Sequence, residues 1–497
     1  MFSRLAFMSK NLQGRTGIYA LSGLGFFLLA VYAGVVVVSD GFVYAQWDIT
    51  RQTLIYIALA MAAGILCSGL LWLVPRLPKS GRLVGGALGV VFVVGLLARL
   101  MMFASNPVLE DDWHRYLWDG ASVANGIDPY AYAPAEATPI TRLGERPGWS
   151  DDPQLADLQA LTEEDIVVYA RVNYPYFKTI YPPIAQAGFG LAHILAPFSL
   201  NGWRAVLLMV DLGSFVLMCF ALKAFGRSVL WSGLYWWNPV IVLEMFNAGH
   251  MDGLIVPFLV GVLLLARLGR LRLALLALAG AAAVKLWPAL LAPALVRRVM
   301  FKPVALIGYA SLFCIAAGVL LWPQLSHVYG YVPGEGFGIL DSDQGLVAYA
   351  EGWRRNAFLF TMLSDGLLGW LDDDGAAARR IIMLVVAGGA LLLAWRRPQD
   401  SEALPATLLA TVALLIFLSP TGYPWYQIWL AGLIPFAPRL GYLALMTTAP
   451  LYYTRFLLGD SDPIYQYLIV PVAFGVPLIL LLGPFLRGMG RLRKKTG

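Results

Sequence analysis

Residues 83–120, LVGGALGVVFVVGLLARLMMFASNPVLEDDWHRYLWDG, join an apolar segment to a dense acidic and aromatic cluster. The apolar part, 83–104, is long enough to cross a bilayer as a helix. Three consecutive carboxylates, Glu110, Asp111 and Asp112, follow shortly after it. Like charges this close repel one another and shift their pKa values, so a plain soluble linker has little reason to carry them. The stretch therefore indicates chemistry at the surface of a membrane.

The composition of the whole chain points to the same class of protein. Of 497 residues, 59% are hydrophobic and 13% are charged, and the mean hydropathy is +0.68. These values predict an all-α polytopic membrane protein, with Trp and Tyr at the two interfaces. The net charge of +6 comes from basic residues at the ends of apolar segments, so we expect membrane lipids and no nucleic acid as partners. Three cysteines lie far apart inside apolar runs, which favours packing over disulfides or thiolate metal sites.

Apolar segments and basic flanks together predict a topology. Basic residues cluster at alternate ends of the segments, which places both termini in the cytoplasm. We expect about 12 to 14 membrane-spanning helices in a monomer. The apolar segments are 17–39, 52–75, 83–104, 204–222, 229–246, 253–267, 303–321, 378–395, 404–419, 424–438, 441–457 and 466–486.

Two further segments are ambiguous. Residues 273–297 carry Arg on both flanks but are only just long enough for one crossing, so we interpret them as two half-helices with Lys285 and Pro288 at the outer tip. One tilted span with a snorkelling Lys285 is the alternative. Residues 183–199 are apolar, but a crossing there would put several basic residues outside, so we expect a re-entrant or surface helix.

This topology leaves two large extracytoplasmic segments. The first is acidic and contains turn signals such as Asn125-Gly126, which predict a folded loop domain. No repeat of 20 to 50 residues is visible, so a solenoid is excluded. The expected organisation is two extra N-terminal helices (1–82), a central membrane module (83–440) with large outer loops at 106–182 and 322–377, and C-terminal helices with a basic cytoplasmic tail (441–497).

Several short motifs fall on the outer face of this topology, and their order resembles a known family. It is similar to the GT-C fold of membrane glycosyltransferases, in particular glycosyltransferase family 87 and the first mannosyltransferase of GPI-anchor synthesis. The motifs are Asp112-x-x-Arg115-Tyr116, Tyr181-Pro182-Pro183-Ile184-Ala185-Gln186, Asn238-Pro239 with Gly249-His250-x-Asp252, Lys285-Leu286-Trp287-Pro288, Trp353-Arg354-Arg355-Asn356 and Ser419-Pro420-Thr421-Gly422-Tyr423-Pro424-Trp425-Tyr426.

The resemblance implies an inverting glycosyltransferase with a lipid-linked donor. It implies a sugar, mannose being favoured, on a polyprenyl phosphate, and transfer to an acceptor hydroxyl of a lipid or glycan. The reaction would take place on the extracytoplasmic face of a bacterial inner (plasma) membrane, in the synthesis of cell-envelope glycans. The residues agree, because no Gly-rich dinucleotide loop or Walker-type loop is present to hold a nucleotide sugar.

The acidic cluster supplies the expected base. Asp112 occupies the Asp-x-x-Arg-Tyr position of the resemblance, and Asp111 is the second choice. Glu110 and Asp112 also form an acidic-x-Asp pair that resembles the Asp-x-Asp of GPI mannosyltransferases and could hold Mg²⁺ or Mn²⁺ through oxygen ligands. The alternative for the trio is a solvated loop that caps a helix. Asp119 is expected to form hydrogen bonds within the loop.

Cations and donors on the outer face are the candidates for the phosphate and the sugar. Lys178 precedes the Pro-Pro step much as a lysine does in the lipid A aminoarabinose transferase. Two residues, His250 and Asp252, are too few for zinc, so hydrogen bonds to substrate are expected of them. The full set of substrate candidates is Lys178, Tyr181, Glu244, His250, Asp252, Lys285, Arg354 and Arg355.

Two charges lie inside apolar segments and have a structural interpretation. Asp211 sits in the middle of a span and is expected to be a satisfied structural carboxylate. For Arg99, just below the acidic loop, an ion pair or a snorkelled anchor is expected. Two other classes of protein stay open at this point. A transporter predicts repeats and helices broken at mid-bilayer in both halves, and a polysaccharide polymerase or ligase would share lipid-linked substrates.

Overall fold

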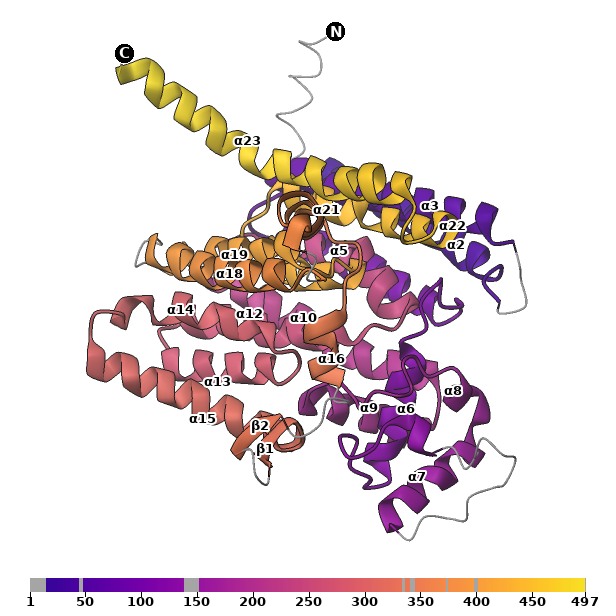
Figure 1. Cartoon of the computed structure of the whole chain (residues 1–497). Helices are drawn as coiled ribbons and strands as arrows, with labels where there is room; N and C mark the ends of the chain where they lie inside the picture. The colour runs from indigo at the N-terminus through magenta and orange to yellow at the C-terminus, as the bar shows by residue number, and fades with distance from the viewer. Residues whose placement is uncertain are drawn as a thin grey trace.

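The computed structural model describes residues 15–43, 48–137, 152–332, 336–339, 345–371, 374–396 and 401–496. This part of the chain is almost entirely helical (Figure 1). The exception is a two-stranded antiparallel ribbon, β1 (Tyr329–Val332) and β2 (Gly336–Ile339), which the sequence did not predict. The prediction of an all-α polytopic membrane protein is otherwise confirmed. The three cysteines are free, as expected.

Seven helices in the described residues are long and apolar enough to cross a membrane. Each coincides with a predicted apolar segment, which confirms an integral membrane protein. They are α2 (Arg15–Ser39), α3 (Thr50–Ser68) extended by α4 (Leu70–Leu73) to Arg76, α5 (Arg82–Met102), α10 (Leu200–Ala224), α15 (Pro303–Val328), α18 (Ala376–Arg396) and the segment Tyr465–Gly483, which includes the start of α23 (Val470–Thr496).

The other predicted spans are short or broken. The described residues therefore contain seven helices of spanning length, or eight if the bent pair below counts as one span, against the expected 12 to 14. Segments 229–246 and 253–267 become α11 (Gly233–Trp236), the helical turn Val240–Asn247 and α12 (Val256–Arg267), with a 116° bend near Gly249. Gly249 has φ +81°, a conformation that suits glycine. Segment 404–419 forms only α19 (Leu404–Leu418).

Prolines explain why the two remaining predicted spans do not form continuous helices. Residues 424–438 contain only short turns around α20 (Ile428–Ala431), and 441–457 divides into α21 (Leu440–Thr448), a tight turn and α22 (Arg455–Leu458). Pro424, Pro435 and Pro450 each lie at the start of a short turn. Proline has no N–H and fixes its own φ, so it interrupts a continuous helix at each place.

The segment 106–182, which the sequence analysis placed outside the membrane, is largely helical in its described residues, and 138–151 lie outside the described part. It contains α6 (Trp113–Ala124), α7 (Pro153–Glu164) and α8 (Ile166–Ala170), at the lower right of Figure 1. Residues 183–199 form α9 (Pro183–Leu195), which packs along α6 and is too short to count among the seven spans. A Cβ on Gly120 would lie 2.4 Å from the Phe189 carbonyl oxygen, so glycine is needed where α6 and α9 touch.

The segment 273–297 is broken at the position that the sequence suggested. It consists of α13 (Leu271–Ala282), a turn at 283–286, and short helical turns over 287–299 that pack against α13 and include α14 (Ala292–Leu295). A single tilted span is therefore wrong. Lys285 differs from the prediction in one respect: its side chain is 26% exposed and lines a cavity, so it does not stand at an open tip.

The N-terminal helices pack on both the central module and the C-terminal helices. α2 packs against α5, and α3 packs against α21. A buried ion pair between Arg99 of α5 and Asp211 of α10 lies in the core of the central module, and both side chains are 0% exposed. Arg99 also donates to the carbonyls of Gly95 and Trp236, and the Tyr235 hydroxyl donates to Asp211. The structural interpretation of both charges is confirmed.

Loss of one partner of this pair should destabilise the fold. Asp211→Asn leaves the Arg99 guanidinium buried without a counter-charge, and we expect a loss of about 3–5 kcal/mol in unfolding free energy. Thermal unfolding in detergent measures the effect. The double variant Arg99→Met/Asp211→Leu removes both charges and should lose much less stability. An Asp211→Asn midpoint equal to that of the wild type would contradict a structural role.

Candidate active site

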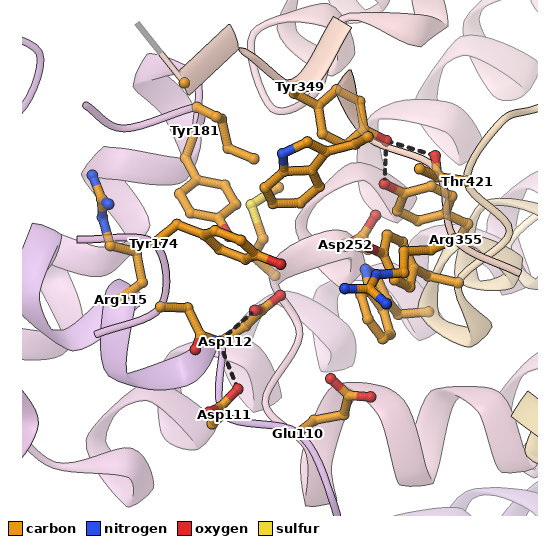
Figure 2. A pocket seen from close by; sticks show the side chains of 18 of the residues that line it. Glu110, Asp111, Asp112, Arg115, Tyr174, Tyr181, Asp252, Tyr349, Arg355 and Thr421 are labelled. Carbon is orange, nitrogen blue, oxygen red and sulfur yellow. Dashed lines mark hydrogen bonds between the residues drawn. The ribbon is translucent and has the colours of Figure 1, made fainter. Parts of the chain in front are cut away.

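A cavity of about 820 Å³ lies beside the acidic cluster. Each of the six sequence motifs contributes to its wall, although they are spread over more than 300 residues. Figure 2 shows Arg115, Tyr174 and Tyr181 on one side, and Tyr349, Arg355 and Thr421 on the other. The contributing motif residues include Asp112, Tyr181, Asp252, Lys285, Arg355 and Thr421. Motifs that are distant in the chain thus form one site.

The acidic loop is held in place by a side chain from the bent helix pair. The Asn247 amide oxygen accepts a hydrogen bond from the Val108 N–H (3.0 Å), and its amide nitrogen donates to the Asn106 carbonyl (2.7 Å). Leu109 follows with φ +61°, a conformation that costs a non-glycine residue energy and is often found at functional sites. This kink leads directly into Glu110, Asp111 and Asp112.

Asp112 stands at the N-cap position of α6 but does not cap it. Its side chain makes no hydrogen bond to the first turn of the helix, so helix capping does not explain this carboxylate. Its Oδ1 accepts a hydrogen bond of 3.2 Å from the Asn173 amide, which also donates to Asp111 at 2.5 Å. Burial, and then the charge of Asp111, raise the pKa of Asp112 to about 6.

Glu110 also lines the cavity. One of its carboxylate oxygens is buried and makes no hydrogen bond. Burial, followed by the charges of Asp112 and Glu244, raises the pKa of Glu110 well above its usual range. Within the described residues, no three His, Cys, Asp or Glu side chains are grouped to hold a metal ion. A Mg²⁺ or Mn²⁺ ion at Glu110 and Asp112 would therefore need further oxygen ligands from a substrate, as is usual for Mg²⁺.

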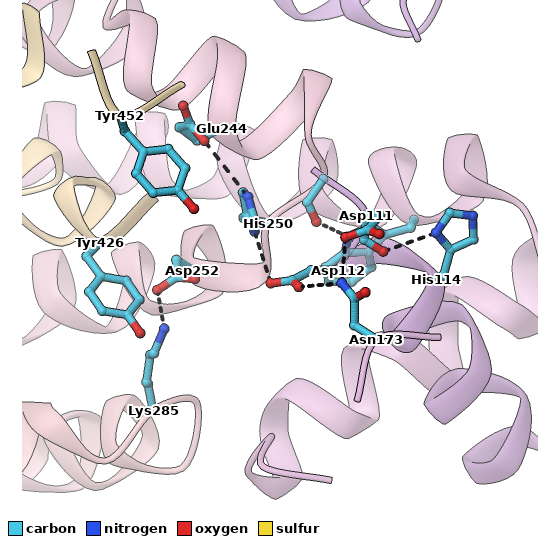
Figure 3. A network of polar contacts seen from close by, with 12 residues as sticks. Asp111, Asp112, His114, Asn173, Glu244, His250, Asp252, Lys285, Tyr426 and Tyr452 are labelled. Atoms are coloured by element: carbon cyan, nitrogen blue, oxygen red, sulfur yellow. Dashed lines mark hydrogen bonds and ion pairs between the residues drawn. The ribbon is translucent and has the colours of Figure 1, made fainter. Parts of the chain in front are cut away.

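Behind Asp112 lies a layer of buried polar residues. His250 sits between Asp112 and Glu244, with 3.8 Å from its Nδ1 to Asp112 and 3.9 Å from its Nε2 to Glu244 (Figure 3). The Tyr453 hydroxyl bonds to Glu244, and the His250 ring stacks on Trp425. Neither His250 nor Glu244 lines the cavity. The structure places these two predicted substrate contacts behind the wall, next to the expected base.

Lys285 is held at the cavity by a carboxylate and by aromatic rings. Its Nζ donates to Asp252 Oδ1 at 2.8 Å, and the indole N–H of Trp429 donates to the same oxygen at 2.6 Å. The ammonium also lies 4.3 Å from the centre of the Tyr426 ring. Asp252 is 1% exposed, and its Oδ1 holds both Lys285 and Trp429 at the cavity wall. This leaves the ammonium as a positioned cation on the cavity wall.

The two adjacent arginines point to different places. Arg355 forms a backbone bridge with Thr421, and its side chain lines the cavity and contacts Asp460. Arg354 is bound instead to Asp365 (2.8 Å) and Thr361 (3.2 Å) and does not line the cavity. Of the predicted pair, the structure therefore brings only Arg355 to the site.

Residues of the YPP motif and of the preceding loop complete one side. Lys178 and Tyr181 both line the cavity, as the sequence suggested. Asp119 accepts hydrogen bonds from Arg115 (2.7 Å), Thr179 (2.6 Å) and Gln186 (3.0 Å). The prediction that Asp119 forms hydrogen bonds within the loop is confirmed.

Sequence reasoning missed several polar residues of the site, among them Asn173 and Arg455. Asn173, which binds both Asp111 and Asp112, lies in a loop with no motif that marks it. Arg455 lines the cavity from α22, bound to Asp460. A signal existed for Arg455, because it falls inside a segment that was predicted to span the membrane, where an arginine is costly.

Comparison of the sequence with protein-family models gives no match, and comparison with curated proteins gives no significant relative. The function must therefore be inferred from the site. The site combines Asp112, a carboxylate that does not cap its helix and whose pKa is raised, with Lys178, Lys285 and Arg355 in one cavity.

Proposed function

We propose that this protein is an integral membrane glycosyltransferase that uses a polyprenyl-phosphate sugar, with mannose as the favoured sugar. It transfers the sugar to a hydroxyl of a lipid or glycan acceptor with inversion, and Asp112 is the general base. The observation that carries the proposal is the position of Asp112. This carboxylate does not cap α6 and faces the same cavity as Arg355 (Figure 2). Lys285 lines that cavity too.

The reaction would proceed in a single displacement. The acceptor oxygen attacks the anomeric carbon, and the bond from that carbon to the phosphate oxygen breaks with its electron pair on the phosphate. Asp112 takes the proton of the acceptor hydroxyl. A pKa of about 6 suits this role, because the carboxylate is mostly ionised at neutral pH but more basic than an ordinary aspartate.

Cations on the wall would stabilise the phosphate as it leaves. Lys285 is a point charge whose position is set by Asp252, and Lys178 adds a second ammonium. Arg355 can form a forked contact with phosphate oxygens. Fixed charges of this kind stabilise a transition state strongly in a site with little water.

The rest of the wall suits a lipid-linked substrate. Apolar and aromatic side chains such as Leu109, Phe177, Ile180 and Trp287 line the cavity beside the charged groups. A prenyl chain can pack on these surfaces while the phosphate meets the cations. A transporter with a duplicated core would carry a sequence repeat between its halves, and no such repeat is visible.

A donor panel tests the proposal. Purified protein in lipid nanodiscs is incubated with polyprenyl phosphates that carry different sugars and with extracts of membrane lipids and glycans. We expect one donor to yield a new glycoside and free polyprenyl phosphate in equal amounts. Absence of transfer from every donor, with the protein folded, would overturn the assignment.

The pH dependence of the reaction should follow the protonation of the Asp112 carboxylate. Protonation removes the base, so kcat/KM should fall as the pH drops through about 6. The hydrogen bond from Asn173 favours the ionised form of Asp112 and lowers its pKa. Asn173→Ala should therefore move the acid limb of the profile to higher pH. An acid limb that stays in place in this variant would show that Asp112 does not control it.

A further inference from the structure

A second, smaller cavity of about 310 Å³ adjoins the first, and Arg355 lines both. Its walls come from 354–365 and from 460–470. By the predicted topology, 354–365 and 460–465 lie on the same outer side as the acidic loop, and 466–470 form the outer end of the last predicted span. No residue of the acidic loop reaches this cavity, so it is separate from the proposed reaction centre.

The ion pairs in the second cavity argue against a phosphate ligand. Arg354 is bound by Asp365, and Arg355 by Asp460. Asp460 is also held by Arg455 from the main cavity, at 2.8 Å. The carboxylates of Asp365 and Asp460 line the cavity and would repel an anion. On the side of this cavity each arginine thus faces a carboxylate, whereas neither Asp365 nor Asp460 lines the main cavity.

The polar groups of this wall are those that bind hydroxyls. Asn356 and Gln466 carry amides that both donate and accept, and Thr361, Ser461 and Tyr465 carry hydroxyls. The walls are tied together, because Tyr465 donates to Asn356 (3.1 Å) and Gln466 donates to the Asp460 carbonyl (2.9 Å). The wall therefore offers both hydrogen-bond donors and hydrogen-bond acceptors. A ligand rich in hydroxyl groups can use both kinds, because each hydroxyl donates and accepts.

The backbone explains how one motif serves two cavities. Arg355 pairs with Thr421 in an extended bridge, and successive side chains of an extended segment point to opposite faces. Arg354 consequently lines only the second cavity, while Arg355 lies between the two. Asn356 follows with φ +50° and donates to the Gly422 carbonyl (2.5 Å). This connection places the second cavity next to the site of transfer.

We propose that the second cavity binds a neutral, hydroxyl-rich part of the acceptor, a sugar unit next to the one that receives the new sugar. That the bound sugar belongs to the acceptor rests on the proposed function. If it does, the acceptor is a glycan of at least two sugar units. The affinity for neutral sugar itself does not depend on transfer.

A binding experiment without donor tests this proposal. Full-length protein in nanodiscs is titrated with soluble methyl glycosides of hexose mono-, di- and trisaccharides in different configurations, and binding is followed by saturation-transfer NMR. Ser461 is exposed, so Ser461→Trp should fill the cavity without removing a buried contact. Ser80→Trp, at an exposed serine outside both cavities, is the matched control. We expect a di- or trisaccharide to bind the wild type and Ser80→Trp equally, and Ser461→Trp at least about tenfold more weakly.

A second variant guards against misfolding of the first. Gln466→Leu removes an amide from the cavity wall and should also lower the affinity for the sugar. Thermal unfolding checks that both variants are folded. Equal binding by Ser461→Trp and the wild type, displacement of the sugar by inorganic phosphate, or no sugar bound at millimolar concentration would each overturn the proposal. If the donor panel shows no transfer but Ser461→Trp still loses sugar binding, the proposed function fails and the sugar site stands.

Discussion

Asp112→Asn should abolish sugar transfer while the protein stays folded and binds its donor. Asparagine keeps the shape of the side chain but cannot take the acceptor proton, and general-base catalysis accounts for about 10²–10⁴ in rate. The hydrogen bond from Asn173 and the packing near His250 do not require a charge at position 112. Steady-state transfer, donor binding and thermal unfolding measure the three properties separately.

Asp111→Asn is the matched control, because Asn173 binds both aspartates. It removes the negative charge that raises the pKa of Asp112, so it should retain most activity and shift the acid limb to lower pH. Near-normal turnover by Asp112→Asn, or equal losses in both variants, would contradict the assignment of the base.

Loss of the Lys285 ammonium should give the second large effect. Removal of one fixed positive group from the leaving phosphate is expected to lower kcat/KM for the donor about 10²–10³-fold. Lys285→Met alone is ambiguous, because it also leaves Asp252 buried without its cation, which can destabilise the fold.

A double variant separates the two effects. Lys285→Met/Asp252→Asn removes both charges, so thermal unfolding should recover toward the wild type while donor turnover stays low. Lys285→Arg keeps the charge and should retain partial activity. If the double variant is both stable and as active as the wild type, Lys285 does not bind the phosphate.

Local chemistry in the sequence was sufficient for the class of protein and for much of the site. Hydropathy located the seven long helices, because burial in lipid demands about 20 apolar residues wherever a helix crosses. Motif order and basic flanks put Asp112, Tyr181, Lys285 and Arg355 on one face, and the structure brings them to one cavity. Asp211 and Arg99 were recognised as structural because a charge in an apolar segment needs a partner.

Other features depend on contacts that no local pattern records. Asn173 reaches Asp112 across 61 positions of the chain, and Asp460 reaches Arg355 across more than 100. Hydropathy also counted apolar segments around Pro424 and Pro450 as spans, although proline breaks the helix there. The different directions of Arg354 and Arg355 follow from an extended backbone that forms only when Thr421 lies beside it.

The most direct test of the central claim is the configuration of the anomeric carbon before and after transfer by the wild-type protein. NMR of the donor and of the isolated product gives both configurations in one experiment. A single displacement with Asp112 as base predicts an inverted centre and the release of polyprenyl phosphate. A product with retained configuration would contradict this account, and so would transfer that proceeds without release of polyprenyl phosphate.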